Sequence, residues 1–94
     1  MAMFLVVAIN DTSGAAIAAA LTAMFPNEHY VIAGHTWFVN SDSPTAKDLS
    51  DTLGITKAGS ALNMGVVVSI KGYYGGAPGD LWEWVSAKVE KANG

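Results

Sequence analysis

The alternation of hydrophobic and polar positions predicts four strands in this chain of 94 residues. Residues 3–10 and 64–71 are nearly continuous apolar runs rich in branched side chains, which is typical of strands covered on both faces. Residues 29–40 hold two shorter apolar runs with Gly34 and His35 between them. We therefore expect a hairpin in which strands 30–33 and 36–40 flank a tight turn.

Between these strands, three segments show the apolar spacing of helices. In residues 11–25 the expected N-cap lies among Asp11, Thr12 and Ser13, and Pro26 stops the helix. The apolar side chains that share one stripe of this helix are Ile17, Leu21, Met24 and Phe25. The first helix is therefore expected to pack through that stripe.

The second and third helices are indicated by their end signals. Ser43 suits the N-cap of the second helix, Pro44 its first helical position and Gly54 the C′ position. Asp80 opens the third helix, with Glu83 three residues later as in a capping box. The expected inward residues are Ala46, Leu49 and Leu53 in the second helix, and Leu81, Val85, Val89 and Ala92 in the third.

The resulting order is β-α-β-β-α-β-α, which predicts an α+β fold. This order is the ferredoxin-like plan, an antiparallel sheet in spatial order 4-1-3-2, with one added C-terminal helix. We expect a single domain over residues 1–94 with the first two helices on one face of the sheet. The other face then needs the third helix, a second subunit or both. We therefore predict a homodimer built through that face and the aromatic segment 72–84.

Composition and charge narrow the choice of partners. Half of the residues are hydrophobic (51%) and only 14% are charged, which is apolar for so small a domain and favours association. The net charge is −3, and the five basic residues are all lysines. Because arginine supplies the forked contacts that usually hold phosphates and bases, nucleic-acid binding is disfavoured.

The sequence contains no sign of export. No apolar run approaches the roughly 18 residues of a membrane span, and the N-terminal run reaches Asn10 and Asp11 without a basic region before it. There is no cysteine, which excludes a disulfide framework and thiolate metal sites. These features predict a cytoplasmic protein without membrane contact.

The predicted topology brings a few polar residues together. Asp11 follows the first strand and His35 occupies the hairpin turn, at the same edge of the sheet. An aspartate beside a histidine is able to bind a metal ion or to serve as an acid–base pair. The plainer alternative is that Asp11 caps the first helix and His35 decorates a turn. At the opposite edge, Glu28, His29 and Asp42 form a second candidate cluster, whose plainer interpretation is a solvated rim.

The stretch KGYYGGAPGDLWEW, residues 71–84, raises the question of a phosphate site. A strand, a glycine-rich loop and a helix start follow one another there, as in phosphate-binding loops. However, no lysine or hydroxyl follows the glycines in the spacing that a phosphate-binding loop requires. Asp80 would also occupy the backbone amides at the helix start and repel an anion there. The stretch is therefore interpreted as a corner between strand and helix and as a subunit contact.

Three short stretches carry a resemblance to a known group of proteins. FLVVAIN in the first strand, HTWFV in the third and DLWEWV after the last strand resemble small bacterial proteins labelled SinR-like. That group is related to the ferredoxin-like subunit of CRISPR spacer acquisition and to VapD-type toxins. The resemblance implies a dimer and a metal-dependent nuclease whose aspartate ends the first strand. Here Ala8 and Ile9 stand where the group has tyrosine and aspartate, so only Asp11, two residues later, is available as a substitute.

Three functions follow from these features and stay open at this point. The first is a non-catalytic homodimer, tied to a bacterial defence or toxin system. The second is a nuclease in which Asp11 and His35 act as catalytic residues and hold Mg²⁺ or Mn²⁺. The third is a sensor that binds a small ligand between subunits, by analogy with other ferredoxin-like dimers.

Overall fold

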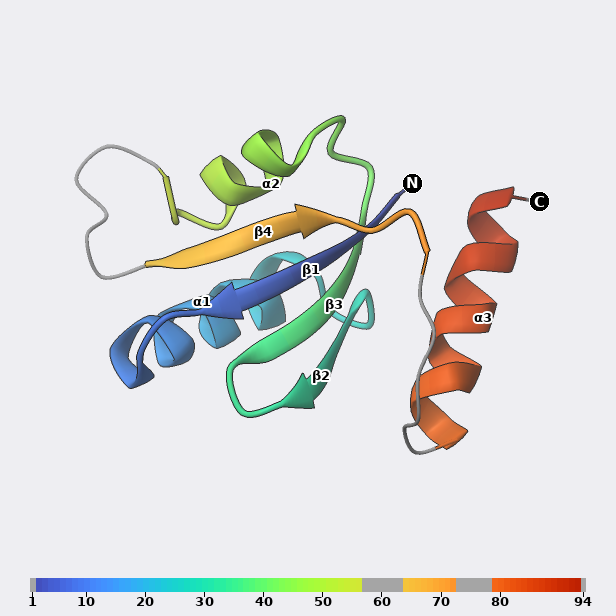
Figure 1. Ribbon diagram of the computed structural model, residues 1–94, viewed down its shortest axis with the longest axis horizontal. Coiled ribbons are helices and arrows are strands. Elements are labelled where there is room, and N and C mark those ends of the chain that lie inside the picture. The colour runs from blue at the N-terminus through green and yellow to red at the C-terminus, as the bar shows by residue number, and fades with distance from the viewer. Residues whose placement is uncertain (1, 57–63, 73–78, 94) are drawn as a thin grey trace.

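The computed structural model describes residues 2–56, 64–72 and 79–93 and shows an α+β protein (Figure 1). The predicted fold class is confirmed. The elements in chain order are β1 (Ala2–Ala8), α1 (Asp11–Met24), β2 (His29–Ala33), β3 (Thr36–Ser41), α2 (Ala46–Thr52), β4 (Gly65–Ser69) and α3 (Gly79–Asn93).

The strands form one antiparallel sheet in the order β2-β3-β1-β4. Counted from the β4 edge, the same order reads 4-1-3-2, as the sequence predicts. The central strand β1 sets Val6 opposite Trp37 of β3 on one side and opposite Val67 of β4 on the other. The hairpin turn between β2 and β3 contains Gly34 at a φ of 46°, a left-handed conformation that glycine adopts without strain.

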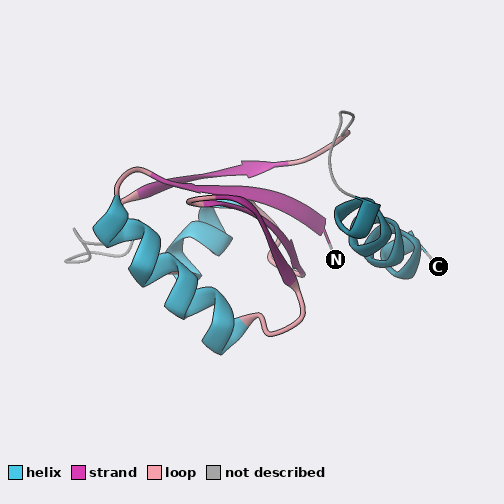
Figure 2. Ribbon diagram, turned by 90° about the horizontal axis from the view of Figure 1, so that it is seen from below, coloured by secondary structure: helices cyan, strands magenta, loops and turns pink. Residues whose placement is uncertain are grey.

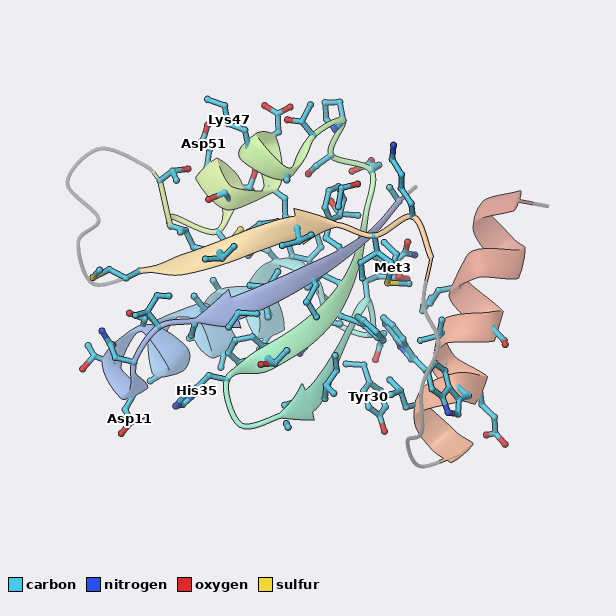
Figure 3. All side chains as sticks on the ribbon, in the orientation of Figure 1. Met3, Asp11, Tyr30, His35, Lys47 and Asp51 are labelled. Carbon is cyan, nitrogen blue, oxygen red and sulfur yellow. The ribbon has the colours of Figure 1, made fainter. Side chains whose placement is uncertain are left out.

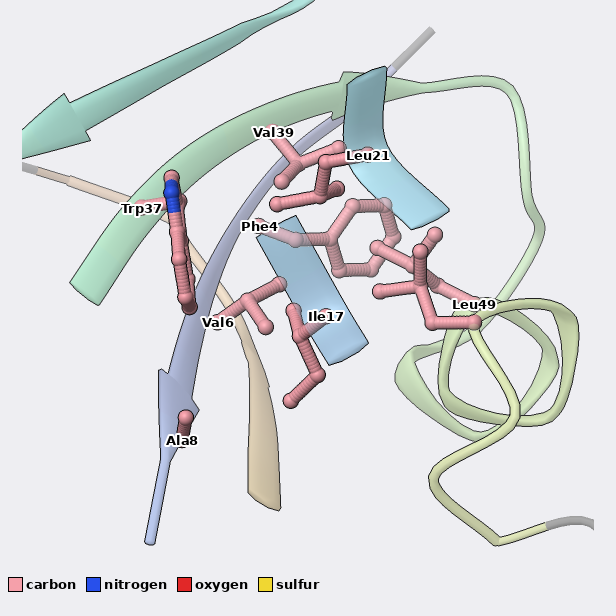
Figure 4. Close-up of a cluster of buried hydrophobic side chains, with 9 residues drawn as sticks. Phe4, Val6, Ala8, Ile17, Leu21, Trp37, Val39 and Leu49 are labelled. Carbon is pink, nitrogen blue, oxygen red and sulfur yellow. The ribbon is translucent and has the colours of Figure 1, made fainter. Parts of the chain in front are cut away.

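The core lies on the face of the sheet that α1 and α2 cover (Figure 2). Phe4 and Val6 of β1 meet Ile17 and Leu21 of α1 and Leu49 of α2 there, all at 1% exposure or less (Figure 4). This burial confirms the predicted stripes of the two helices in most positions. Met24 is the exception at 45% exposure, whereas the next residue, Phe25, packs against the cluster.

The N-caps predicted for α1 and α2 are both wrong, and α2 begins at Ala46 instead of Pro44. Helix α3 begins at Gly79, one residue before the predicted Asp80. Asn10 caps α1 in extended conformation, and its side-chain oxygen accepts from the Ser13 amide at 2.8 Å. Thr45 caps α2 and accepts from the Asp48 amide at 3.1 Å, while Ser43 bonds back to Ser41. Several neighbouring residues have suitable side chains at each start, so the end of the preceding strand or turn decides which one caps. The predicted Gly54 at C′ is confirmed by its φ of 83°, one residue after the C-cap Leu53.

The other face of the sheet was expected to need α3, a second subunit or both, and α3 covers one end of it, where Met3 and Asn40 are 8% and 2% exposed. The described helices leave the rest of that face open. We define the open face by the uncovered residues among those whose side chains point away from α1 and α2: Leu5, Val7, Phe38, Val66 and Val68. In β4, Val67 packs against the core, so its neighbours Val66 and Val68 point outward and stay 49% and 47% exposed. Among the described elements, α3 makes its main contacts with β1 and β2, at the end of the sheet near the N-terminus (Figures 1 and 2).

The described helices include none that is both long and apolar enough to span a membrane.

Candidate functional site

The predicted pair of Asp11 and His35 is brought together at one end of the molecule (Figure 3). Asp11 is the first residue of α1, and His35 lies in the β2–β3 turn. Nε2 of His35 lies 2.7 Å from Oδ1 of Asp11, within hydrogen-bond distance. The backbone carbonyl of His35 also accepts from the Ala8 amide at 2.8 Å, which ties the turn to the end of β1.

A glycine in α1 makes room for this contact. A Cβ at Gly14 would overlap the imidazole ring of His35, at Nδ1 and at the carbons on either side of it. The ring therefore lies directly against the backbone of the first turn of α1. Sequence reasoning found the pair but not Gly14, because a glycine inside a helix gives no local sign of what crosses it.

The chemistry of this pair is limited by its exposure. The Asp11 side chain is fully exposed and that of His35 is 40% exposed. Within the described ranges, no group of three or more His, Cys, Asp or Glu side chains is placed to hold a metal ion. One carboxylate and one imidazole do not fit Mg²⁺ or Mn²⁺, which prefer several oxygen ligands. The structure shows the pair as a hydrogen bond between two exposed side chains at the surface.

The second predicted cluster is not formed as expected. Glu28 turns away from His29 and accepts from Nζ of Lys88 in α3 at 2.8 Å and from Nδ2 of Asn40 at 2.9 Å. His29 instead places Nδ1 2.7 Å from the Phe25 carbonyl. Asp42 takes part in none of these hydrogen bonds of Glu28 and His29. Lys88 was missed from the sequence, because it lies 60 positions from Glu28.

These polar contacts attach α3 to the end of the sheet. Asn40 is 2% exposed, and the side chains of Lys88 and Glu28 are 16% and 24% exposed. Beside them, the rings of Tyr30 and Trp84 lie 5.8 Å apart at a tilt of 43°, with Lys88 6.0 Å from the Trp84 ring. The ion pair is thus largely shielded from water, and the aromatic contact lies beside it. We call these five residues, Glu28, Tyr30, Asn40, Trp84 and Lys88, the anchor of α3.

The aromatic segment 72–84 was predicted to form part of a subunit interface. Residues 73–78, with Tyr73 and Tyr74, lie outside the described residues, as does the side chain of Asp80. Trp84 uses its ring on Tyr30 of the same chain. This contact within one chain accounts for Trp84 and not for Trp82, the other described aromatic residue of the segment.

The open face is an apolar surface that the described residues leave exposed. Its exposed members Val66 and Val68 lie opposite the half-buried Val7 and Leu5 across the β1–β4 pair. Ile9 and Met64, which follow and precede these strands, are 57% and 51% exposed and lie side by side, since the Ile9 amide bonds the Met64 carbonyl. No charged side chain belongs to this group.

The chain was compared with family models, with curated proteins and with solved structures, and none of them matches it. The resemblance to SinR-like proteins therefore stays an expectation from the short stretches that carry it.

Proposed function

We propose that the chain is a non-catalytic association module that forms a homodimer through the open face of its sheet. The observation that carries this proposal is the exposure of Val66 and Val68 at 49% and 47% in the middle of a strand. Removing apolar surface from water lowers the free energy by about 25 cal/mol per Å². A second copy of the same face would remove that surface from water on both partners.

The arrangement of the elements supports the same proposal. We assign the fold to the ferredoxin-like group, on the element order and on the strand order 4-1-3-2 counted from β4. With both helices of that plan on one side, its sheet keeps a second face free. Because α3 is anchored at the end of the sheet, the surface over Leu5, Val7, Val66 and Val68 is left for a partner.

Light scattering coupled to size-exclusion chromatography tests the proposal. At micromolar concentration we expect a particle of twice the 9.8 kDa of the chain. Val68→Lys should yield the monomer, because a two-fold interface would bring two ammonium groups into an apolar contact. Met24→Lys is the matched control, since Met24 is equally exposed at 45% but lies at the end of α1, away from the open face. A monomeric wild type would refute the homodimer, as would a Val68→Lys variant that keeps the dimer mass.

The contact between Asp11 and His35 favours one second candidate, a metal-dependent nuclease. Its weakness is the ligand set described above, and for that reason we rank it below the association module. Cleavage of RNA and DNA in the presence of Mg²⁺ or Mn²⁺ tests it directly. Activity of the wild-type chain that is lost in Asp11→Asn, with the dimer mass unchanged, would favour the nuclease. Equal results for both chains would remove Asp11 from consideration.

A further inference from the structure

A groove runs between α1 and the edge strand β2, on the helix side of the sheet and away from the open face. Its volume is about 610 Å³, and its walls include Ala18 and Thr22 of α1 and Val31 of β2. Trp37 forms part of the groove at the margin of the buried cluster (Figure 4). None of its lining residues is Asp, Glu, Lys or Arg, so the groove suits an uncharged occupant.

The groove exists because α1 does not reach under β2. The small side chain of Ala18 faces the strand, and Val31 remains 53% exposed although its partner Trp37 is 4% exposed. Residues directly opposite in an antiparallel pair share one face of the sheet, so Val31 lies on the same face as Trp37. Val31 is thus a core-face residue that this chain leaves without a cover among the described elements.

The backbone of β2 adds a second and independent feature. The Asn40 amide donates to the Glu28 carbonyl at 2.8 Å, which marks Glu28 and Asn40 as a hydrogen-bonded pair of the β2–β3 ladder. Since such pairs alternate along an antiparallel ladder, Tyr30 and Phe38 form the next one. The amides and carbonyls of His29 and Val31 therefore point outward from the sheet, about 7 Å apart along the edge.

This edge and the groove together match one kind of occupant. Donors and acceptors that repeat every second residue are matched by the backbone of another extended chain, and the side chains of His29 and Val31 lie above the groove. A residue paired with Val31 would direct its own side chain to the same side, into the groove. We propose that β2 binds an extended, uncharged peptide by strand addition, with alternate apolar side chains in the α1–β2 groove.

The bulge in β2 limits the length of this pairing. The register shifts between Val31 and Ala33, which leaves Ile32 without a partner on β3. Strand addition is therefore confined to residues 29–31, and the bulge protects the remainder of the edge. A short site of this kind predicts weak binding to a peptide that presents a few alternating apolar residues.

NMR titration of the full chain with a blocked peptide, acetyl-Ser-Leu-Thr-Leu-Thr-Leu-Ser-amide, tests the proposal. At about 2 mM peptide, we expect shifts of the His29 and Val31 amides and of Thr22, with slower hydrogen exchange at both amides. No shift at these positions would overturn the proposal. Shifts confined to the opposite edge, at β4, would overturn it as well.

N-methylated peptides distinguish backbone pairing from apolar contact. In an antiparallel addition, a peptide residue opposite His29 or Val31 bonds the edge and also directs its side chain into the groove, so N-methylation of the leucines should weaken binding at least about tenfold. N-methylation of the threonines, whose amides point away, should change it less than about threefold. Equal effects of the two peptides would refute strand addition.

A variant of the protein completes the test. Val31→Lys should abolish the shifts, because it places a charge at the groove wall, while Met24→Lys should bind like the wild type. Neither substitution lies on the open face, so both variants should keep the dimer mass. A failure of the homodimer and a failure of peptide binding are therefore seen in different measurements. Unchanged binding in Val31→Lys would contradict the proposal.

Discussion

The two faces of the sheet have a similar apolar pattern but a different cover. On the helix-covered face, Phe4 and Val6 are 1% and 0% exposed beneath α1 and α2. On the open face, Val66 and Val68 remain 49% and 47% exposed, and α3 reaches only the end of the sheet. Alternation along a strand therefore shows that both faces are apolar, but not whether the same chain covers both. The proposed homodimer would cover the face that the described elements leave open.

The largest expected effect is a difference in the free energy of unfolding between substitutions on the two faces. Phe4→Ala should lower the free energy of unfolding by about 3–5 kcal/mol, because it leaves a cavity among fully buried side chains. Val68→Ala should lower it by less than about 1 kcal/mol in the monomer, since its side chain is half exposed already. Urea unfolding at concentrations low enough to hold the monomer measures both. Equal losses would show that the open face is part of the monomer core.

Substitutions in the anchor of α3, which lies at the covered end of the second face, should have an intermediate effect on the free energy of unfolding. Lys88→Met leaves Glu28 partly shielded without its cation and should cost about 1–3 kcal/mol. Glu28→Gln should cost a similar amount, because Lys88 and Asn40 both bond this carboxylate. If the pair acts as a unit, the double variant loses no more than either single variant. Hydrogen exchange should then show α3 opening before the sheet, whereas simple addition of the losses would contradict a shared anchor.

Gly14→Ala should have a smaller effect on stability and a clear effect on local structure. The new Cβ would occupy the place of the His35 ring, so the ring must turn away and lose Asp11. Alanine favours a helix over glycine by about 1 kcal/mol, which offsets part of the loss. In a His35→Ala background the same substitution should therefore stabilise the chain by about that amount. Thermal unfolding of the four chains measures this, and a further loss in that background would show that Gly14 is needed for another reason.

Much of the fold was predictable because its signals are local. Branched apolar runs marked β1 and β4, and Gly34 between two such runs marked the hairpin turn. The N-caps were missed since Asn10 stands beside three other capable residues, and only the end of β1 decides among them. The position of α3 depends on Glu28 and Lys88, which are 60 residues apart, and no periodic pattern reports such a contact.

For the candidate sites, too, one part could be predicted from the sequence and another part could not. The meeting of Asp11 and His35 followed from topology, because a strand end and the next hairpin turn share an edge of the sheet. Their chemistry did not follow, since exposure and the lack of further ligands in the described residues appear only in three dimensions. The α1–β2 groove was not predicted, because Ala18 and Val31 show no sign in sequence of failing to meet.

The smallest expected effect concerns the pKa of Asp51, on the solvent side of α2. The Thr56 hydroxyl and then Lys47, both bonded to Asp51, hold the pKa of the Asp51 carboxyl below its ordinary value (Figure 3). A pKa lowered by folding adds stability above the unfolded pKa, near 3.9, and this stability is lost as the pH falls through the folded pKa. Carboxyl NMR titration should show Asp51 below its ordinary range, and Thr56→Val should raise the midpoint more than Lys47→Met. The reverse order would make the ion pair, and not the hydroxyl, the main cause. Both variants should leave the dimer mass and the burial of Phe4 unchanged, because this pair touches neither face of the sheet.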